Sequence, residues 1–223
     1  MCGICGIQGL ALEKRERYIN DMLKILYLRG PDEEGKYCDE DIALGIKRLS
    51  IIDLKTGSQP IFNEDKTLMV ICNGEIYNFY SLKDNLVKKG HRFYTDSDVE
   101  VLVHLYKEYG SDCLNYIKGM FSFALWNKNE KVLFIARDRF GIKPLYYYNK
   151  NGVFAFSSEL KALLQLPLIS RELNIRALNL YFSLEYVPSP YSIFQEINKL
   201  RPAHFLIYKN NKLEIHRYWD LQS

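Results

Sequence analysis

Residues 119–137 read GMFSFALWNKNEKVLFIAR, and this stretch predicts the kind of sheet that the chain forms. Met120 to Trp126 is apolar and rich in aromatic residues, Asn127 to Lys131 is polar, and Val132 to Arg137 is apolar again. Two strand-like runs that a short polar segment joins are typical of an antiparallel hairpin. The stretch therefore predicts strands that pair with their neighbours along the chain.

The same pattern recurs downstream, where NKNG joins Leu145 to Tyr148 with Val153 to Phe156. Apolar residues at helical spacing predict helices over Arg17 to Leu28, Ser97 to Tyr109, Glu159 to Leu164 and Ile175 to Leu184. Short strands are expected in the proline-punctuated tail. Because hairpins follow one another, we expect an α+β fold with helices covering antiparallel sheets, rather than a parallel βαβ fold.

A wholly apolar run, Leu68 to Cys72, predicts a strand that is covered on both faces. It is followed by Asn73-Gly74, a common turn dipeptide, so we expect the strand to end there. Taken alone, the dipeptide is best interpreted as a hairpin turn.

The composition is that of an ordinary globular protein, with 223 residues, 48% hydrophobic residues and a net charge of +3. We expect one domain over residues 1–223, and we interpret the basic pairs Lys47-Arg48 and Lys88-Lys89 as solvated, without a nucleic-acid partner. The apolar runs are too short to cross a membrane, and the first residues lack the pattern of a secretory signal. Five cysteines, an odd and sparse set, predict reduced thiols and a cytoplasmic location.

The chain begins MCGICG, which places Cys2 and Cys5 in C-x-x-C spacing. A zinc site needs four ligands, but no second C-x-x-C or H-x-x-x-H pattern accompanies this pair, so no metal site is predicted. A thioredoxin-like pair would follow a strand, and only Met1 precedes this one. Two interpretations remain open: both cysteines are small buried residues, or Cys2 is a nucleophile.

Removal of Met1 would leave the α-amine and the thiol on the same residue, Cys2. An α-amine titrates near ~7.7 to ~8.0 and a free thiol near ~8.5, so the amine can accept the thiol proton. Such a nucleophile needs no histidine, and the four histidines have no recognisable triad context: His91, His104, His204 and His216. Attack on an amide creates an oxyanion, for which Asn73 can offer its side-chain amide and Gly74 its backbone N–H.

Seven motifs resemble, in order, the glutaminase domain of glutamine-hydrolysing asparagine synthetases, which are amidotransferases with an N-terminal cysteine nucleophile. They are MCGICGIQG, RGPDEEG, RLSIIDLKTGSQP, NGEIYN, TDSDVE, GMFSFALW and ARDRFGIKPLYY, and YVPSPYSIF and RYWDL extend the likeness into the tail. The resemblance implies a four-layer αββα sandwich of the N-terminal-nucleophile hydrolase type. It also implies hydrolysis of L-glutamine to glutamate and ammonia through a thioester on Cys2.

The resemblance assigns a role to each matching position. Cys2 is the nucleophile and Asn73 and Gly74 form the oxyanion hole, whereas Arg48 binds the α-carboxylate of glutamine. The remaining residues are Glu75 and Asp98, which hold the α-ammonium group, and Leu49, Ile51 and Ile52, whose backbone lines the pocket. One cation and two carboxylates suit a zwitterionic amino acid.

Two positions depart from the family pattern, since Leu28 and Ile46 replace its usual histidines. We expect them to affect packing or coupling between domains rather than hydrolysis. Residues 188–223 are expected to lead toward a synthetase domain, because the chain contains no serine- and glycine-rich pyrophosphate loop.

Glutamine hydrolysis itself is expected to need no cofactor, and ATP and Mg are expected only for the synthetase domain. That domain or a separate subunit would be the partner, with a homodimer as a further option. Two alternatives stay open: an N-terminal-nucleophile enzyme for another amide or acceptor, and a non-catalytic remnant that binds a partner.

Overall fold

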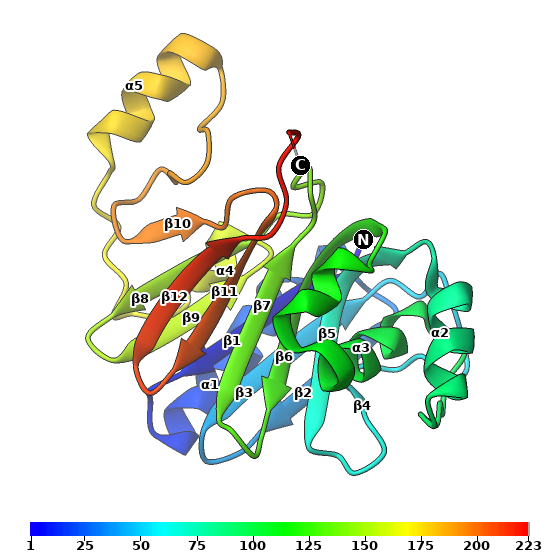
Figure 1. The fold of residues 1–223 in the computed structure, drawn as a ribbon. Coiled ribbons are helices and arrows are strands. Elements are labelled where there is room, and N and C mark those ends of the chain that lie inside the picture. Colours follow the sequence, from blue (N-terminus) through cyan, green and yellow to red (C-terminus); the bar gives the residue numbers. More distant parts are fainter. Residues whose placement is uncertain (223) are drawn as a thin grey trace.

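Two six-stranded antiparallel sheets stack face to face in the computed structural model, which describes residues 1–222 (Figure 1). The strands of the first sheet are β1 Gly3–Gln8, β2 Glu33–Cys38, β3 Ile42–Arg48, β8 Tyr146–Lys150, β9 Val153–Ser157 and β10 Ile197–Lys199, in the order β10-β8-β9-β1-β3-β2. Those of the second are β4 Ile61–Phe62, β5 Leu68–Ile76, β6 Gly119–Asn127, β7 Val132–Arg137, β11 His204–Lys209 and β12 Lys212–Arg217, in the order β12-β11-β7-β6-β5-β4.

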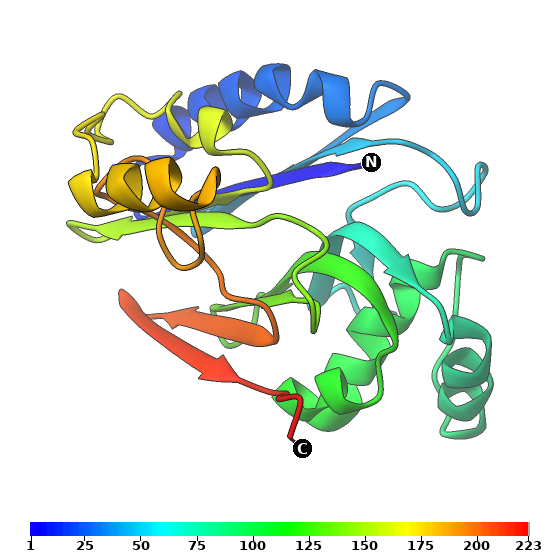
Figure 2. The same ribbon diagram turned by 90° about the horizontal axis from the view of Figure 1, so that it is seen from above.

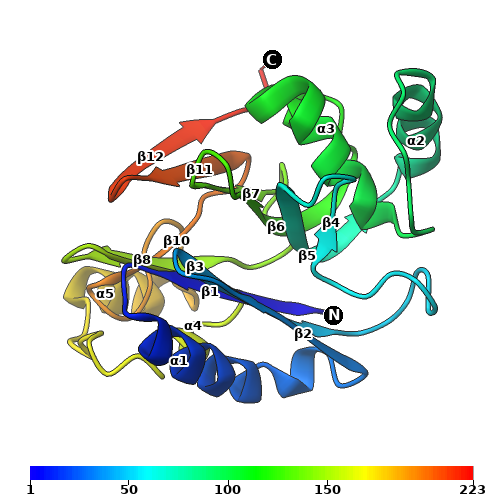
Figure 3. The ribbon, with the colours of Figure 1, turned by 90° about the horizontal axis from the view of Figure 1, so that it is seen from below.

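Helices lie on the outer side of each sheet, as Figures 2 and 3 show. On the first sheet these are α1 Leu12–Ile25 and α4 Leu160–Leu163, and on the second α3 Val101–Tyr109 with α2 Phe79–Lys88 beside it. The fifth, α5 Ile175–Leu184, projects from the body of the molecule (Figure 1). The order helix, sheet, sheet, helix confirms the predicted αββα class. None of the helices in residues 1–222 is long and apolar enough to cross a membrane.

The core has three layers because each sheet is covered on both faces. Along β5, Met69 and Ile71 pack between the sheets, whereas Val70 and Cys72 pack toward α3. Successive side chains of a strand point to opposite faces, so a strand that is buried on both needs an uninterrupted apolar run. This explains the sequence LMVIC and confirms the predicted two-sided burial.

Both predicted hairpins are present, as β6–β7 and β8–β9, but the predicted end of β5 is wrong. The strand runs through Asn73 and Gly74 to Ile76, and these two residues pair with Ser122 and Phe121 of β6. Pairing with a nine-residue neighbour outweighs the local turn preference of Asn-Gly. A Cβ on Gly74 would lie 2.3 Å from the Met120 carbonyl oxygen, so glycine here allows a close approach between strands.

Both predicted ends of the first helix are wrong, since α1 begins at Leu12 rather than Arg17 and ends at Ile25, after which a 3₁₀ turn covers Tyr27–Arg29. Strand β1 was not predicted, because its two glycines and short length give little strand signal. It nevertheless lies inside the first sheet, between β3 and β9. Cys2 therefore directly precedes a central strand, which fixes its place in the fold.

Candidate active site

One pocket of about 620 Å³, open solvent at its mouth included, brings together all nine residues that the sequence suggested for the site. Its lining consists of Met1, Cys2, Arg48, Leu49, Ile51, Ile52, Gln59, Asn73, Gly74, Glu75, Ser97, Asp98, Val99, Met120 and Lys143. The residues come from the chain terminus before β1, from strands β3, β5 and β6, from the segments before β4, after β3 and before β8, and from Ser97 with the 3₁₀ turn Asp98–Glu100.

Cys2 presents its sulfur to this pocket, and its Sγ donates to the Leu49 carbonyl oxygen at 3.7 Å. Burial raises the pKa of the Cys2 thiol, while that hydrogen bond and the charges of the chain terminus, Arg48 and Lys143 act in the opposite direction. Cys5 packs on the other side of the sheet with α1, whereas Cys2 packs toward the space between the sheets. The two thiols thus cannot share a metal ion, and Cys5 is a core residue as predicted.

Asn73 has a side chain that is 1% exposed and makes no hydrogen bond with the residues described. Both its Nδ2 and its Oδ1 are unpaired. A buried amide without partners costs about 1–3 kcal/mol, so native structures rarely keep one unless a ligand or water completes it. The amide is therefore available to a bound molecule in the pocket.

The backbone N–H of Gly74 points away from β6. In an antiparallel pair, alternate residues direct their backbone groups to the same neighbour. Tyr77, directly after β5, donates its backbone N–H to the Lys118 carbonyl. The backbone N–H and C=O groups of the odd-numbered residues of β5 therefore point toward β6. The backbone N–H groups of Cys72 and Ile76 point away from β6. The first donates to Gln59 Oε1 and the second to Asp98 Oδ2, both at 2.7 Å. Gly74 lies between them, and within residues 1–222 no side chain accepts its N–H.

Arg48 is 5% exposed, so the interpretation of Lys47-Arg48 as a solvated pair is wrong for Arg48. Its Nη1 donates to Glu33 at 2.6 Å, and its Nη2 donates to the carbonyls of Ile52 and Asp53 at 2.9 and 2.8 Å. A guanidinium has five N–H donors, and these contacts use three. They hold the segment after β3 in place and leave two donors for a ligand.

Glu75 and Asp98 place two carboxylates on one side of the pocket. Burial raises the pKa of the Asp98 carboxyl, and the charge of Glu75 adds to the rise, against hydrogen bonds from backbone amides such as that of Ile76. Among the described residues neither carboxylate has an ion-pair partner. A buried acid and a half-buried one that both lack a cation favour a positively charged ligand.

Three polar residues of the pocket were missed from the sequence, Gln59, Ser97 and Lys143. Gln59 Oε1 accepts a hydrogen bond from the Cys72 backbone amide, and no local sequence pattern indicates this contact. Lys143 is 5% exposed and has no ion-pair partner within residues 1–222. It belongs to the quoted motif ARDRFGIKPLYY, so that motif was the available signal.

The charge of Lys143 should lower the thiol pKa, because it favours the thiolate of Cys2. We expect Lys143→Gln to shift the pH of half-maximal Cys2 alkylation upward. The measurement is the rate of modification by iodoacetamide against pH. Lys128→Gln makes the same charge change on the exposed turn between β6 and β7 and should leave the profile unchanged. An unshifted profile for Lys143→Gln would contradict this electrostatic role.

The two departures from the family pattern lie outside the pocket. Leu28 is 83% exposed, and Ile46 is buried in the apolar layer between the sheets. Neither replacement therefore removes a group that lines the site.

Comparison with known proteins places this site in context. Residues 1–219 match the family described as glutamine amidotransferase domain. Asparagine synthetase [glutamine-hydrolyzing] 1 of Bacillus subtilis (strain 168) is 40% identical over 224 residues, which are 98% of this chain and 35% of that protein. Asparagine synthetase [glutamine-hydrolyzing] of Zea mays is 48% identical over 167 residues, 73% of this chain and 28% of that protein. The chain thus spans about a third of the length of these relatives.

Among solved structures, the fold is similar to that of an allosteric regulatory enzyme of purine biosynthesis, with a TM-score of 0.71 and 20% sequence identity. The match covers 97% of this chain and 49% of that one. At this identity the likeness concerns the fold alone.

Proposed function

Because this chain belongs to the glutamine amidotransferase domain family, we propose that its pocket hydrolyses glutamine to glutamate and ammonia. One observation carries the proposal. The unpaired amide of Asn73 and the outward N–H of Gly74 line the same pocket as the Cys2 thiol. This is the arrangement that acyl transfer requires, a nucleophile beside two donors that are preorganised for an oxyanion.

The reaction begins once removal of Met1 has freed the α-amine of Cys2. The amine takes the thiol proton, and the thiolate attacks the side-chain carbonyl carbon of glutamine. Asn73 and Gly74 donate to the oxyanion, and ammonia leaves with a proton returned by the α-ammonium group. A water molecule, deprotonated by the same amine, attacks the thioester. Collapse releases glutamate and the free thiol, so the base and the nucleophile return to their initial states.

The charges of the pocket select the substrate. Arg48 offers two donors for the α-carboxylate of glutamine, and Glu75 and Asp98 face its α-ammonium group. With these ends fixed, the side-chain amide extends toward Cys2. The α-ammonium group of such a zwitterion would give Glu75 and Asp98 the cation that they lack in the free protein, whereas Arg48 keeps its pair with Glu33 and adds a second anion.

We expect Arg48→Ala to raise the KM for glutamine by about 10- to 100-fold, since charge-assisted hydrogen bonds contribute about 1.5–3 kcal/mol. The measurement is steady-state release of ammonia against glutamine concentration. Lys47→Ala is the matched control, because Lys47 pairs with Glu34 at 2.7 Å and does not line the pocket.

A second substrate distinguishes loss of α-carboxylate binding from disruption of the segment after β3, which Arg48 also contacts. The KM for 4-aminobutanamide, which lacks the α-carboxylate, should be the same for Arg48→Ala and the unmodified protein. An equal rise for both substrates would assign Arg48 a structural role only.

The ammonia is proposed to serve asparagine synthesis, as the names of the curated relatives suggest for those proteins. An ATP- and Mg-dependent synthetase domain, in the same polypeptide or a separate subunit, would consume it, and a homodimer is one arrangement. Glutamine hydrolysis itself uses only side chains and the chain terminus, so no cofactor is proposed for it. The free state of all five cysteines supports a reducing compartment such as the cytoplasm.

A further inference from the structure

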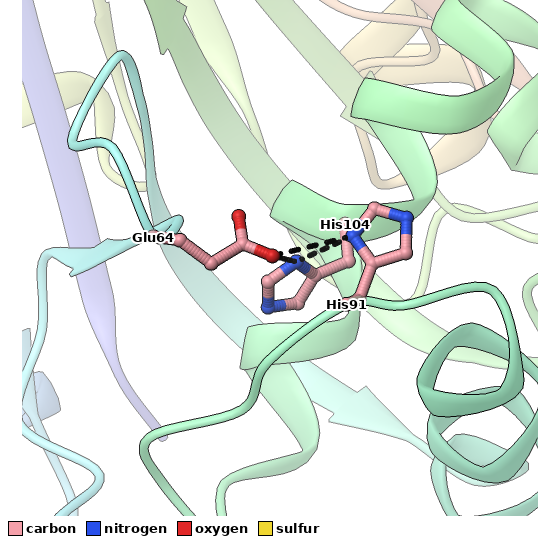
Figure 4. A group of neighbouring side chains, drawn as sticks. All are labelled: Glu64, His91 and His104. Carbon is pink, nitrogen blue, oxygen red and sulfur yellow. Dashed lines mark hydrogen bonds and ion pairs between the residues drawn. The ribbon is translucent and has the colours of Figure 1, made fainter.

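Away from the pocket, Glu64, His91 and His104 converge from three segments of the chain (Figure 4). Glu64 belongs to the turn between β4 and β5, His91 follows α2, and His104 lies on α3. The two Nδ1 atoms are 3.1 Å apart, and Glu64 Oε1 is 3.6 Å from each of them. Both imidazoles are buried, whereas the Glu64 side chain is partly exposed.

The other nitrogen of each ring faces a carboxylate. His91 Nε2 is 3.0 Å from Glu108 Oε1, and His104 Nε2 is 3.6 Å from Glu100 Oε1. The contact with Glu108 favours the His91 tautomer with the proton on Nε2. The Glu100 carboxylate is too far from His104 Nε2 for a hydrogen bond, but its negative charge favours the same tautomer there, so that the lone pairs of both rings lie on Nδ1. Three electron-pair donors, two imidazole nitrogens and one carboxylate oxygen, then face one another.

Three such donors repel each other unless a positive group compensates them. Lys107 pairs with Glu64 Oε2 at 3.3 Å and the Arg92 amide donates to Oε1 at 3.1 Å, but within residues 1–222 no cation contacts the two Nδ1 atoms. Ligand atoms about 2.0–2.1 Å from a tetrahedral ion are separated by about 3.3 Å, and the observed spacings bracket that value. We propose that Glu64, His91 and His104 bind one divalent transition-metal ion of the zinc class. Imidazole ligands favour zinc and its neighbours over calcium or magnesium, and the partly exposed side of Glu64 leaves room for a water molecule as the fourth ligand.

A shared proton is the rival occupant of this cluster, because it could bridge the two Nδ1 atoms as a hydrogen bond. The position of Glu64 favours the metal. Its Oε1 is equidistant from both nitrogens and, at 3.6 Å, too far from either for a hydrogen bond. A central ion requires equal distances of this kind, whereas a single imidazolium would draw the carboxylate toward one ring.

A bound ion would brace the connection between α2 and α3. Glu100, which faces His104, accepts hydrogen bonds from the backbone amides of Tyr94 and Thr95 at 2.8 and 2.7 Å. The ion would therefore join the β4–β5 turn to α3 and to residues 91–95. We expect the metal to raise the stability of the fold rather than to take part in hydrolysis.

The experiment uses the full chain, stripped of metal with a chelator and titrated with zinc against a chromophoric competitor. We expect one zinc ion per chain, and a higher midpoint of thermal unfolding with zinc than with chelator. Replacement by Co²⁺ should give the strong visible absorption bands of tetrahedral coordination. Failure to bind stoichiometric zinc would leave the shared proton as the occupant and overturn the proposal.

Variants locate the ion. Glu64→Gln and Glu108→Gln replace partly exposed carboxylates and should fold, unlike a change at the fully buried His104. We expect Glu108→Gln to weaken zinc binding by about 10- to 100-fold and Glu64→Gln to weaken it further, since Glu64 is a direct ligand. Cys2→Ala and His216→Asn are the controls and should bind zinc like the unmodified chain. Unchanged affinity in both Glu variants, or loss of binding in Cys2→Ala, would overturn the assignment.

Discussion

Replacement of Cys2 by alanine is expected to abolish glutamine hydrolysis, with kcat/KM falling on the order of 10⁴-fold or more. The reason is that no other group in the pocket can form the acyl intermediate, since the remaining lining offers no second thiol. The α-amine and the oxyanion donors would remain, but they would have no nucleophile to serve. The measurement is ammonia release by a coupled assay over a range of glutamine concentrations that extends below the KM, which gives kcat/KM directly.

Two controls make the result specific. Cys38→Ala removes a partly exposed thiol on β2, outside the pocket, and should retain full activity. Intact mass of the unmodified protein should show that Met1 is absent, because a retained methionine would replace the free amine of Cys2 with an amide. Cys2→Ala with undiminished turnover and a native circular dichroism spectrum would reject the thioester mechanism.

The second large effect is expected at Asn73, where alanine should lower kcat by about 10²- to 10³-fold, the usual result of removing one oxyanion donor. Its effect on folding should be small or favourable. Because neither polar atom of the Asn73 side chain has a partner, alanine removes a buried group that is unpaired in the free protein. In Asn73→Ala, kcat would thus fall while the thermal stability stays the same or rises.

Asn63 provides the matched control, since it is also an almost fully buried asparagine, in the turn between β4 and β5. Its Oδ1 accepts from the Leu68 amide at 2.9 Å, and its Nδ2 donates to Thr67 Oγ1 at 3.2 Å. Asn63→Ala should therefore cost about 1–3 kcal/mol of stability and leave kcat unchanged at a temperature where the variant is folded. If Asn73→Ala retained full kcat, or lost as much stability as Asn63→Ala, Asn73 would be a structural residue.

Local sequence patterns predicted several elements whose partners are close in the chain, although the hairpin β2–β3 and the helix α2 were missed. The hairpin β6–β7 is an example, because two apolar runs and one polar turn suffice to specify it. Strand β1 was not predicted, since its residues Gly3 and Gly6 give no strand preference and pairing with distant β3 and β9 decides its conformation. The same long-range pairing keeps Asn73-Gly74 in a strand where local preference predicted a turn.

The residues of the pocket likewise include some that sequence motifs predicted and others that only the tertiary structure brings to the site. Its nine predicted residues came from motif resemblance together with the chemistry of a thiol, an amide and matched charges. Gln59 and Lys143 were missed because their roles arise from tertiary placement. The cluster of Glu64, His91 and His104 was missed for a related reason, since spacings of 27 and 13 residues match no short metal-binding pattern.

The placement of Asn73 and Gly74 within β5 also bears on how the protein loses activity. A site built on a loop can be inactivated by local opening while the rest of the molecule stays folded. Here the donors are part of the nine-residue strand that pairs along its whole length with β6. Fraying cannot reach them without separating two of the longest strands, so heat inactivation should follow the same cooperative melting curve as the entire domain.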